Sequence, residues 1–121
     1  MKLVKIRNKY MYRPKRGEKY DPEGNHTYMV YKDKTTKKIY AIQTTHLYEK
    51  KKEKKIENGT LMVAKLPKIK YPSGIHKQIY KTDINGNPID LKRVNAINCD
   101  GGNKSVYVPS KLSKKVLKFV R

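Results

Sequence analysis

Two apolar and aromatic stretches decide the fold: Thr-Tyr-Met-Val-Tyr at residues 27–31 and Lys-Ile-Tyr-Ala-Ile-Gln-Thr-Thr-His at residues 38–46. β-Branched and aromatic residues of this kind are typical of strands. The polar residues 32–37 between the two stretches indicate a connecting turn. The sequence therefore predicts a β-hairpin near the centre of the chain.

Further short strands are predicted on both sides of this hairpin. They are residues 2–7, 60–66, 75–80, 91–98 and 104–108. Asn85-Gly86 is a strong hairpin signal, so we expect residues 91–98 to pair with residues 75–80. Tyr-Pro-Ser-Gly at residues 71–74 and Asp-Gly-Gly-Asn at residues 100–103 indicate turns. Six or seven short strands favour a mainly β fold, a small antiparallel barrel of the SH3-like or a related kind.

The chain is predicted to end in a short α-helix over residues 110–120. Its apolar residues share one helical face and its lysines occupy the rest, and the apolar set is Leu112, Val116, Phe119 and Val120. Ser110 is expected to be the N-cap. The 121 residues then form a single small domain, with residues 1–20 as a basic arm and residues 49–58 as a flexible basic loop.

The charge is strongly one-sided. Thirty Lys and Arg stand against ten Asp and Glu, a formal net charge of +20. Seventeen of these net charges fall in residues 1–20, 50–55 and 104–121. Such an excess opposes compact folding by self-repulsion, and a polyanion would relieve it. Nucleic acid is therefore the predicted partner, with an anionic membrane, an acidic protein or mere solubilisation as the alternatives.

Several classes of protein are excluded by the same composition. No apolar run is long enough to cross a membrane, and the N-terminus lacks the apolar region of a secretory signal, so we expect a cytoplasmic protein. A lone Cys99 allows no internal disulfide and no cysteine-based zinc site. His26, His46 and His76 lie far apart without acidic neighbours at ligand spacing. We therefore expect no metal and no cofactor.

Tyrosines alternate with cations in the loops, a pattern that suits stacking on unpaired bases while cations hold the phosphates. The predicted nucleic-acid-binding residues are Lys9, Tyr10, Tyr12, Arg13, Lys15, Arg16, Tyr48, Lys50, Lys51, Lys52, Lys54, Lys55, Tyr71, Lys114, Lys115 and Lys118. Three other tyrosines lie within predicted strands, and they are Tyr28, Tyr40 and Tyr107. A place in the core explains them as well as base stacking does.

Metal-independent RNA cleavage is a second chemistry that these residue types allow. It needs a group that accepts the proton of the ribose 2′-OH, a cation beside the phosphate and a donor for the leaving oxygen. Thr44, Thr45 and His46 lie together at a predicted strand end, with Thr44 and His46 on one face and Thr45 on the other. The candidate catalytic residues are Arg16, Thr45 and His46, and Arg13 is the alternative cation.

The order of features resembles that of the PemK/MazF-like toxins, compact SH3-like barrels that cut RNA without a metal ion. The matching parts are Arg-Gly-Glu at residues 16–18, the strands at residues 25–31 and 39–45, and the final helix over residues 109–120. In that group a loop Arg and a strand-end Thr or Ser form the catalytic pair. The resemblance implies Arg16 or Arg13 with Thr44 or Thr45. One feature does not match: the strand after the first loop has a different sequence in this chain from the strand typical of that group.

The sequence thus predicts a small basic protein that binds nucleic acid, RNA ahead of DNA. A metal-independent endoribonuclease toxin is the alternative function. A third is a phage or mobile-element protein that binds and inhibits an acidic or nucleic-acid-processing protein. An acidic partner protein such as an antitoxin, and a homodimer, remain open as partners, whereas a membrane is not expected.

Overall fold

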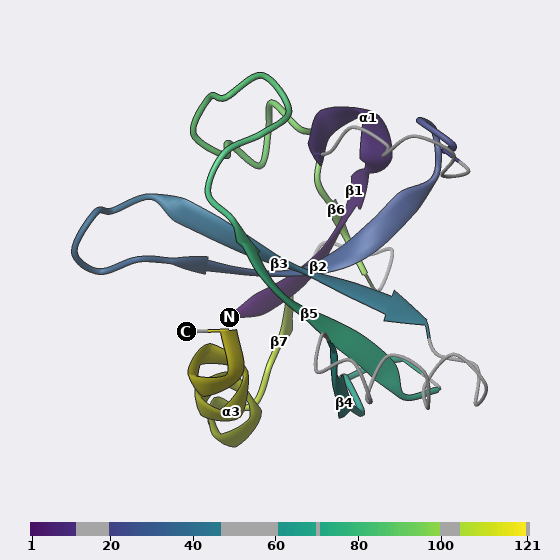
Figure 1. Cartoon of the computed structure of the whole chain (residues 1–121), viewed down its shortest axis with the longest axis vertical. Helices are drawn as coiled ribbons and strands as arrows, with labels where there is room; N and C mark the ends of the chain where they lie inside the picture. The colour runs from purple at the N-terminus through teal and green to yellow at the C-terminus, as the bar shows by residue number, and fades with distance from the viewer. Residues whose placement is uncertain (12–19, 47–60, 70, 100–104, 121) are drawn as a thin grey trace.

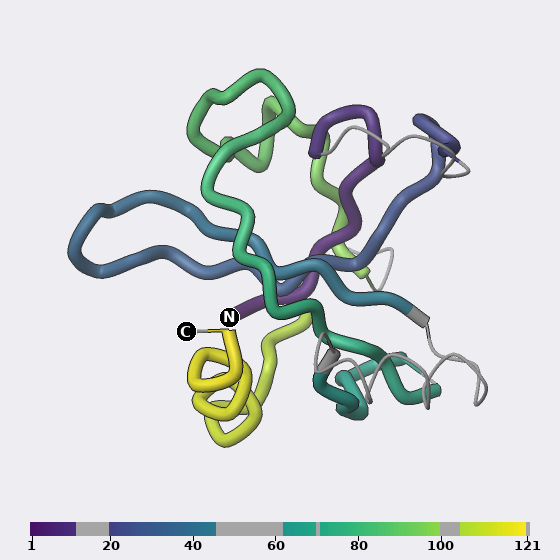
Figure 2. The backbone as a smooth tube through the Cα atoms, in the orientation of Figure 1, coloured from purple at the N-terminus to yellow at the C-terminus, as the bar shows by residue number. Residues whose placement is uncertain are grey.

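The computed structural model describes residues 1–11, 20–46, 61–69, 71–99 and 105–120. Figures 1 and 2 show a strongly twisted sheet with helix α3 at one end of the long axis and helix α1 at the other. The elements are β1 (Lys2–Arg7), α1 (Asn8–Met11), β2 (Asn25–Lys32), β3 (Ile39–His46), β4 (Leu61–Ala64), β5 (Ser73–Tyr80), β6 (Ile97–Asn98), β7 (Val106–Tyr107) and α3 (Ser110–Val120). The protein is therefore mainly β with a short C-terminal helix, as predicted.

The described strands form a seven-stranded antiparallel sheet in the order β4-β5-β3-β2-β1-β6, with β7 also paired to β1. Strand β1 pairs with β2 along one edge and divides its other edge between β6 and β7. Among these residues no pairing joins β4 to β6, so the sheet is open. The predicted closure into a barrel is not seen in this part of the chain.

The central hairpin is confirmed. Strands β2 and β3 pair antiparallel, with Tyr28 opposite Gln43 and Lys32 opposite Ile39. Two backbone hydrogen bonds close the turn between them: Asp33 N donates to the carbonyl of Lys38, and Lys37 N donates to the carbonyl of Asp33. Both faces of this hairpin are covered, which explains why residues 28–30 are all buried instead of alternating with polar residues.

Two apolar clusters lie on opposite faces of the sheet. The first core cluster is packed by α3 and comprises Leu3, Met29, Ile42, Leu66, Ile75, Val106, Val108, Val116 and Val120. The second core cluster is covered by α1 and residues 89–94, and comprises Val4, Ile6, Met11, Tyr28, Val30, Ala41, Ile89 and Val94. Because successive strand residues point to opposite faces, neighbours such as Leu3 and Val4 enter different clusters.

Helix α3 has the predicted bounds and the predicted apolar face. Val116 and Val120 are buried, and Leu112 and Phe119 pack on the first core cluster. The expectation that Ser110 is the N-cap is wrong. The carbonyl of Pro109 accepts the hydrogen bond of Ser113 N, so Pro109 is the N-cap and Ser110 belongs to the first turn.

Residues 82–96 depart from the predicted hairpin. Thr82 and Pro88 form an isolated bridge, and Gly86 takes the left-handed turn conformation with φ of 79°. Residues 91–95 then form turns, not a strand, and only Ile97–Asn98 is extended, paired with β1. The predicted pairing of residues 91–98 with residues 75–80 is therefore wrong. Strand β5 also begins two residues early, within the stretch predicted as a turn at residues 71–74.

No helix in the described residues is both long and apolar enough to cross a membrane.

Candidate nucleic-acid interface

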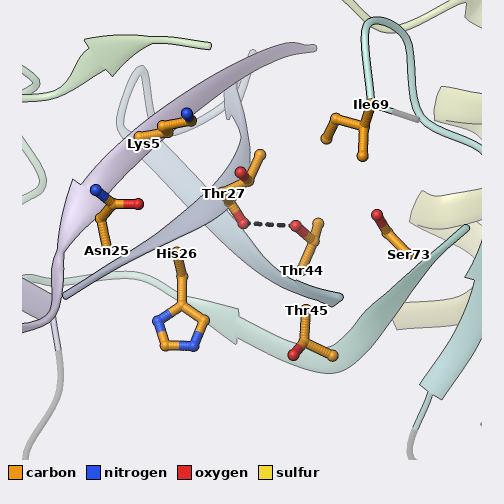
Figure 3. A pocket seen from close by; sticks show the side chains of 8 residues that line it. All are labelled: Lys5, Asn25, His26, Thr27, Thr44, Thr45, Ile69 and Ser73. Atoms are coloured by element: carbon orange, nitrogen blue, oxygen red, sulfur yellow. Dashed lines mark hydrogen bonds between the residues drawn. The ribbon is translucent and has the colours of Figure 1, made fainter. Parts of the chain in front are cut away.

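A polar pocket of about 340 Å³ lies where β3 ends and β2 begins. Its lining residues, shown in Figure 3, are Lys5, Asn25, His26, Thr27, Thr44, Thr45, Ile69 and Ser73. Two of the predicted catalytic hydroxyls thus reach one hollow. Lys5 and His26 were not predicted there. The signal that could have found His26 is the predicted hairpin, because it brings the start of β2 beside the end of β3, where Thr45 lies.

Thr44 has a structural role in this pocket. Its side chain is buried, and Oγ1 donates a hydrogen bond of 2.8 Å to the carbonyl of Thr27. That bond joins two neighbouring strands through a side chain. Thr44 is therefore a poor choice of reactive hydroxyl, whereas Thr45 is half-buried at the pocket wall.

The ring of His26 is oriented by Asn8. The amide nitrogen of Asn8 donates to the carbonyl of Asp21 at 2.9 Å, so the amide oxygen faces His26 Nδ1, at 2.6 Å. An oxygen at that distance requires a proton on Nδ1, and the neutral ring then carries its lone pair on Nε2. In this tautomer Nε2 is the ring nitrogen that can act as a base.

The pocket residues divide between the two faces of the sheet. Lys5 pairs with Thr27 across β1 and β2, and both lie on one side in Figure 3. His26 and Thr45 point to the other side. The cation and the imidazole therefore do not converge on one point. Of the predicted catalytic residues, Arg16 and its alternative Arg13 fall outside the described residues, as does the side chain of His46.

The described carboxylates are mostly used to hold turns. Asp21, Asp33, Asp83 and Asp90 each accept hydrogen bonds from backbone amides two to four residues further along the chain. This is the local bonding typical of Asp in turns. Both ion pairs between described residues are made by the remaining carboxylate, that of Glu23. The structure therefore compensates little of the basic charge with ion pairs in this part of the chain.

Glu23 binds two cations of the predicted basic arm. Its carboxylate lies 2.7 Å from Arg7 Nη1 and 3.0 Å from Lys9 Nζ. The hydrogen bond from Lys9, followed by the charges of Lys9 and Arg7, lowers the pKa of Glu23. The ammonium of Lys9 also lies 5.4 Å from the ring centre of Tyr10. Lys9, a predicted phosphate contact, is thus engaged within the protein.

The predicted stacking tyrosines have different surroundings. Tyr10 packs against the second core cluster, and its hydroxyl accepts a hydrogen bond of 2.7 Å from Asn95 Nδ2. Tyr71 is 61 % exposed. Tyr28 is buried as expected, but Tyr107 is 72 % exposed, so its predicted place in the core is wrong. Tyr71 and Tyr107 are therefore largely exposed, and Tyr10 supports the fold.

The lysines of α3 form an exposed row on the side of the helix away from the sheet, and they are Lys111, Lys114, Lys115 and Lys118. Figure 1 shows α3 at the opposite end of the molecule from α1, which contains Lys9 and directly follows Arg7. These two basic segments do not converge. The remaining predicted binding residues lie outside the described residues, and they are Tyr12, Arg13, Lys15, Arg16, Tyr48, Lys50, Lys51, Lys52, Lys54 and Lys55.

In the described ranges no group of three or more His, Cys, Asp or Glu side chains is placed to hold a metal ion. Comparisons with protein-family models, curated proteins and solved structures found no match for this chain.

Proposed function

We propose that this protein binds nucleic acid, with single-stranded RNA as the main ligand, through its lysines and arginines. One observation carries the proposal: the described carboxylates hold turns or, in Glu23, pair with two cations only. The described residues hold eighteen Lys and Arg against five Asp and Glu. A phosphate backbone would neutralise these cations and release its counterions.

The exposed tyrosines support a single-stranded ligand. Tyr71 and Tyr107 offer exposed rings, and base stacking on such rings requires unpaired bases. Proteins that recognise RNA sequences use the same stacking contact with the unpaired bases of RNA loops and ends. Phosphate contacts then supply affinity, and the tyrosines favour single strands over duplexes.

The test is binding of a fluorescent 20-nucleotide RNA and its DNA counterpart, measured by anisotropy over a salt series. The logarithm of affinity is expected to fall linearly with the logarithm of salt concentration, with a slope of several units. Absence of binding to either strand, or affinity that does not respond to salt, would contradict the proposal. Tyr71→Ala and Tyr107→Ala are expected to weaken RNA binding without changing the slope.

Metal-independent RNA cleavage is the second candidate, and the polar pocket favours it. Thr45 and His26 share one side there, and Asn8 holds the ring in the tautomer of a general base. This proposal keeps the predicted Arg16 as the cation. It also keeps the SH3-like barrel implied by the resemblance to PemK/MazF-like toxins, supported by seven antiparallel strands and a final helix.

Cleavage is tested by incubating RNA with the protein in EDTA and analysing the ends. Products with 2′,3′-cyclic phosphate that vanish in His26→Gln but persist in His76→Gln would support the proposal. Intact RNA after long incubation at high protein concentration would end it. Binding by anisotropy is measured on the same variants, so that a loss of cleavage is not mistaken for a loss of binding.

A further inference from the structure

A basic groove that the sequence did not indicate lies between the β2–β3 turn and residues 88–93. It is a hollow of about 630 Å³, and its charged lining residues are Lys32, Lys37, Lys38, Asp90, Lys92 and Arg93. Five of these residues are cations and one is an acid. We propose that this basic groove binds the phosphodiester backbone of a single nucleic-acid strand. The inference rests on the proposed nucleic-acid binding and names its site.

Both walls of the basic groove are held by backbone hydrogen bonds. On one wall Lys37 N donates to the carbonyl of Asp33, and Asp33 N donates to that of Lys38, both at 2.9 Å. On the other wall Val94 N donates to the carbonyl of Asp90 at 3.0 Å. Val94 is buried in the second core cluster. The cations therefore project from a fixed frame, which reduces the ordering cost of binding.

The single acid does not cancel the cations. Hydrogen bonds from the backbone amides of Arg93 and Lys92 lower the pKa of Asp90, so its carboxylate is ionised at neutral pH and directed at its own turn. With one negative charge against five positive ones, the basic groove carries a net charge of +4. Walls of one sign around a hollow concentrate the potential and attract an anionic ligand.

The basic groove adjoins another hollow of the surface. A second hollow, of about 450 Å³, shares Leu91 and Lys92 with it and extends over β1 to Lys2. The second hollow adds one cation, Lys2, beyond the shared Lys92. Two adjoining hollows lined by cations suit an extended polyanion better than they suit one compact anion.

The lining favours a nucleic-acid strand over an acidic protein segment. Protein partners are usually anchored by aromatic residues or arginine in well-packed apolar pockets, and the basic groove contains no aromatic residue and a single arginine among its lining residues. Lysine is a point charge suited to phosphate. A concave path also suits one strand, because duplexes are read by elements that protrude into their grooves.

The test compares two triple variants of the full chain for binding of oligo(U) of 20 nucleotides. Lys37→Gln, Lys38→Gln and Lys92→Gln remove three of the five cations that line the basic groove, and Lys111→Gln, Lys114→Gln and Lys115→Gln make the same charge change on α3. Each phosphate contact contributes about 0.7 to the salt slope of a single strand. The groove variant should therefore lose about 2 units of slope and about a hundredfold in affinity at 0.1 M salt.

The outcomes separate this proposal from the proposed function. An α3 variant that keeps its affinity within tenfold, beside the groove loss above, supports the basic groove. Equal losses in both variants overturn the basic groove and leave nucleic-acid binding standing. No binding by the unmodified protein overturns both. Oligo(U) and oligo(A) of equal length are expected to bind alike, whereas stronger groove-dependent binding of a poly-glutamate peptide would overturn the proposal in favour of an acidic protein. Thermal unfolding checks that both variants fold.

Discussion

Lys37 and Lys68 allow the stability of the fold and the binding of nucleic acid to be separated. Both are exposed, and both have left-handed backbone, with φ of 63° and 61°. Lys37 ends the β2–β3 turn and lines the basic groove, whereas Lys68 lies in a turn closed by Ile69 N and the carbonyl of Leu66. Replacing either lysine by glycine relieves the same backbone strain.

The expected stability change follows from two opposing effects. The left-handed conformation costs a non-glycine residue about 1–2 kcal/mol, and glycine loses about 0.5–1 kcal/mol more backbone entropy on folding. Lys37→Gly and Lys68→Gly should each stabilise the protein by about 0.5–1 kcal/mol, an increase in Tm of about 2–4 °C for a domain of this size. Differential scanning calorimetry measures this increase.

Binding should distinguish the two variants although stability does not. Lys37→Gly removes one phosphate contact, so the salt slope should fall by about 0.7 and the affinity for oligo(U) at 0.1 M salt by about fivefold. Lys68→Gly should change the affinity by less than twofold. A lower Tm for Lys37→Gly would refute the strain argument. An equal loss of affinity in both would show that total charge, and not the basic groove, determines binding.

Three further outcomes are expected. Val116→Ala should cost about 2 kcal/mol, because a fully buried side chain loses two methyl groups and leaves a cavity. Leu117→Ala removes more atoms from a half-buried position outside the first core cluster, and should lower Tm less. Thr44→Val should cost about 1–2 kcal/mol by removing a buried hydrogen bond, with RNA binding unchanged in anisotropy. Glu23 contributes stability above the pKa of its unfolded form, and loses it as pH falls through its lowered folded pKa. The decrease in Tm below pH 4.5 should therefore be smaller in Glu23→Gln, while its RNA affinity rises because Lys9 is released.

The parts of the fold that the sequence predicted are those with a regular pattern over many residues. The β2–β3 hairpin follows from β-branched and aromatic runs around one polar turn, and α3 follows from apolar residues at helical spacing. Both elements carry their own signal. Helix α1 does not, because its four residues are held by distant partners: Asn8 N donates to the carbonyl of Gly24 and Lys9 N to that of Pro22.

The error at residues 91–98 has a local cause. Leu91 and Val94 are three positions apart, a spacing that a helical turn and a short irregular strand share. Asp90 decides between them, since its carboxylate accepts the amides of Lys92 and Arg93 and starts a turn. The Asp directly before this segment therefore indicates a turn. The sequence-based prediction follows the hairpin signal of Asn85-Gly86 instead.

The basic groove could not be predicted because its walls come from segments about fifty residues apart in the sequence. Its position depends on how the chain turns back at residues 82–96 (Figure 2) and packs Ile89 and Val94 into the second core cluster, which no local pattern indicates. The distribution of charge along the sequence also predicts other binding segments, since three of them account for seventeen of the twenty net charges. The charge of those segments predicts that the ligand is an anion. The packing of residues 88–93 beside the β2–β3 turn forms the groove in which we propose that it binds.

The acids explain why the net charge carries meaning for function. Ten carboxylates could have reduced the effect of thirty cations if each bound two of them, as Glu23 binds Arg7 and Lys9. Asp33, Asp83 and Asp90 instead accept turn amides. Asparagine makes the same turns, so Asp→Asn at these positions would retain the fold and raise the charge further. Replacing those aspartates should thus strengthen binding, whereas a charge used only for solubility would leave binding unchanged.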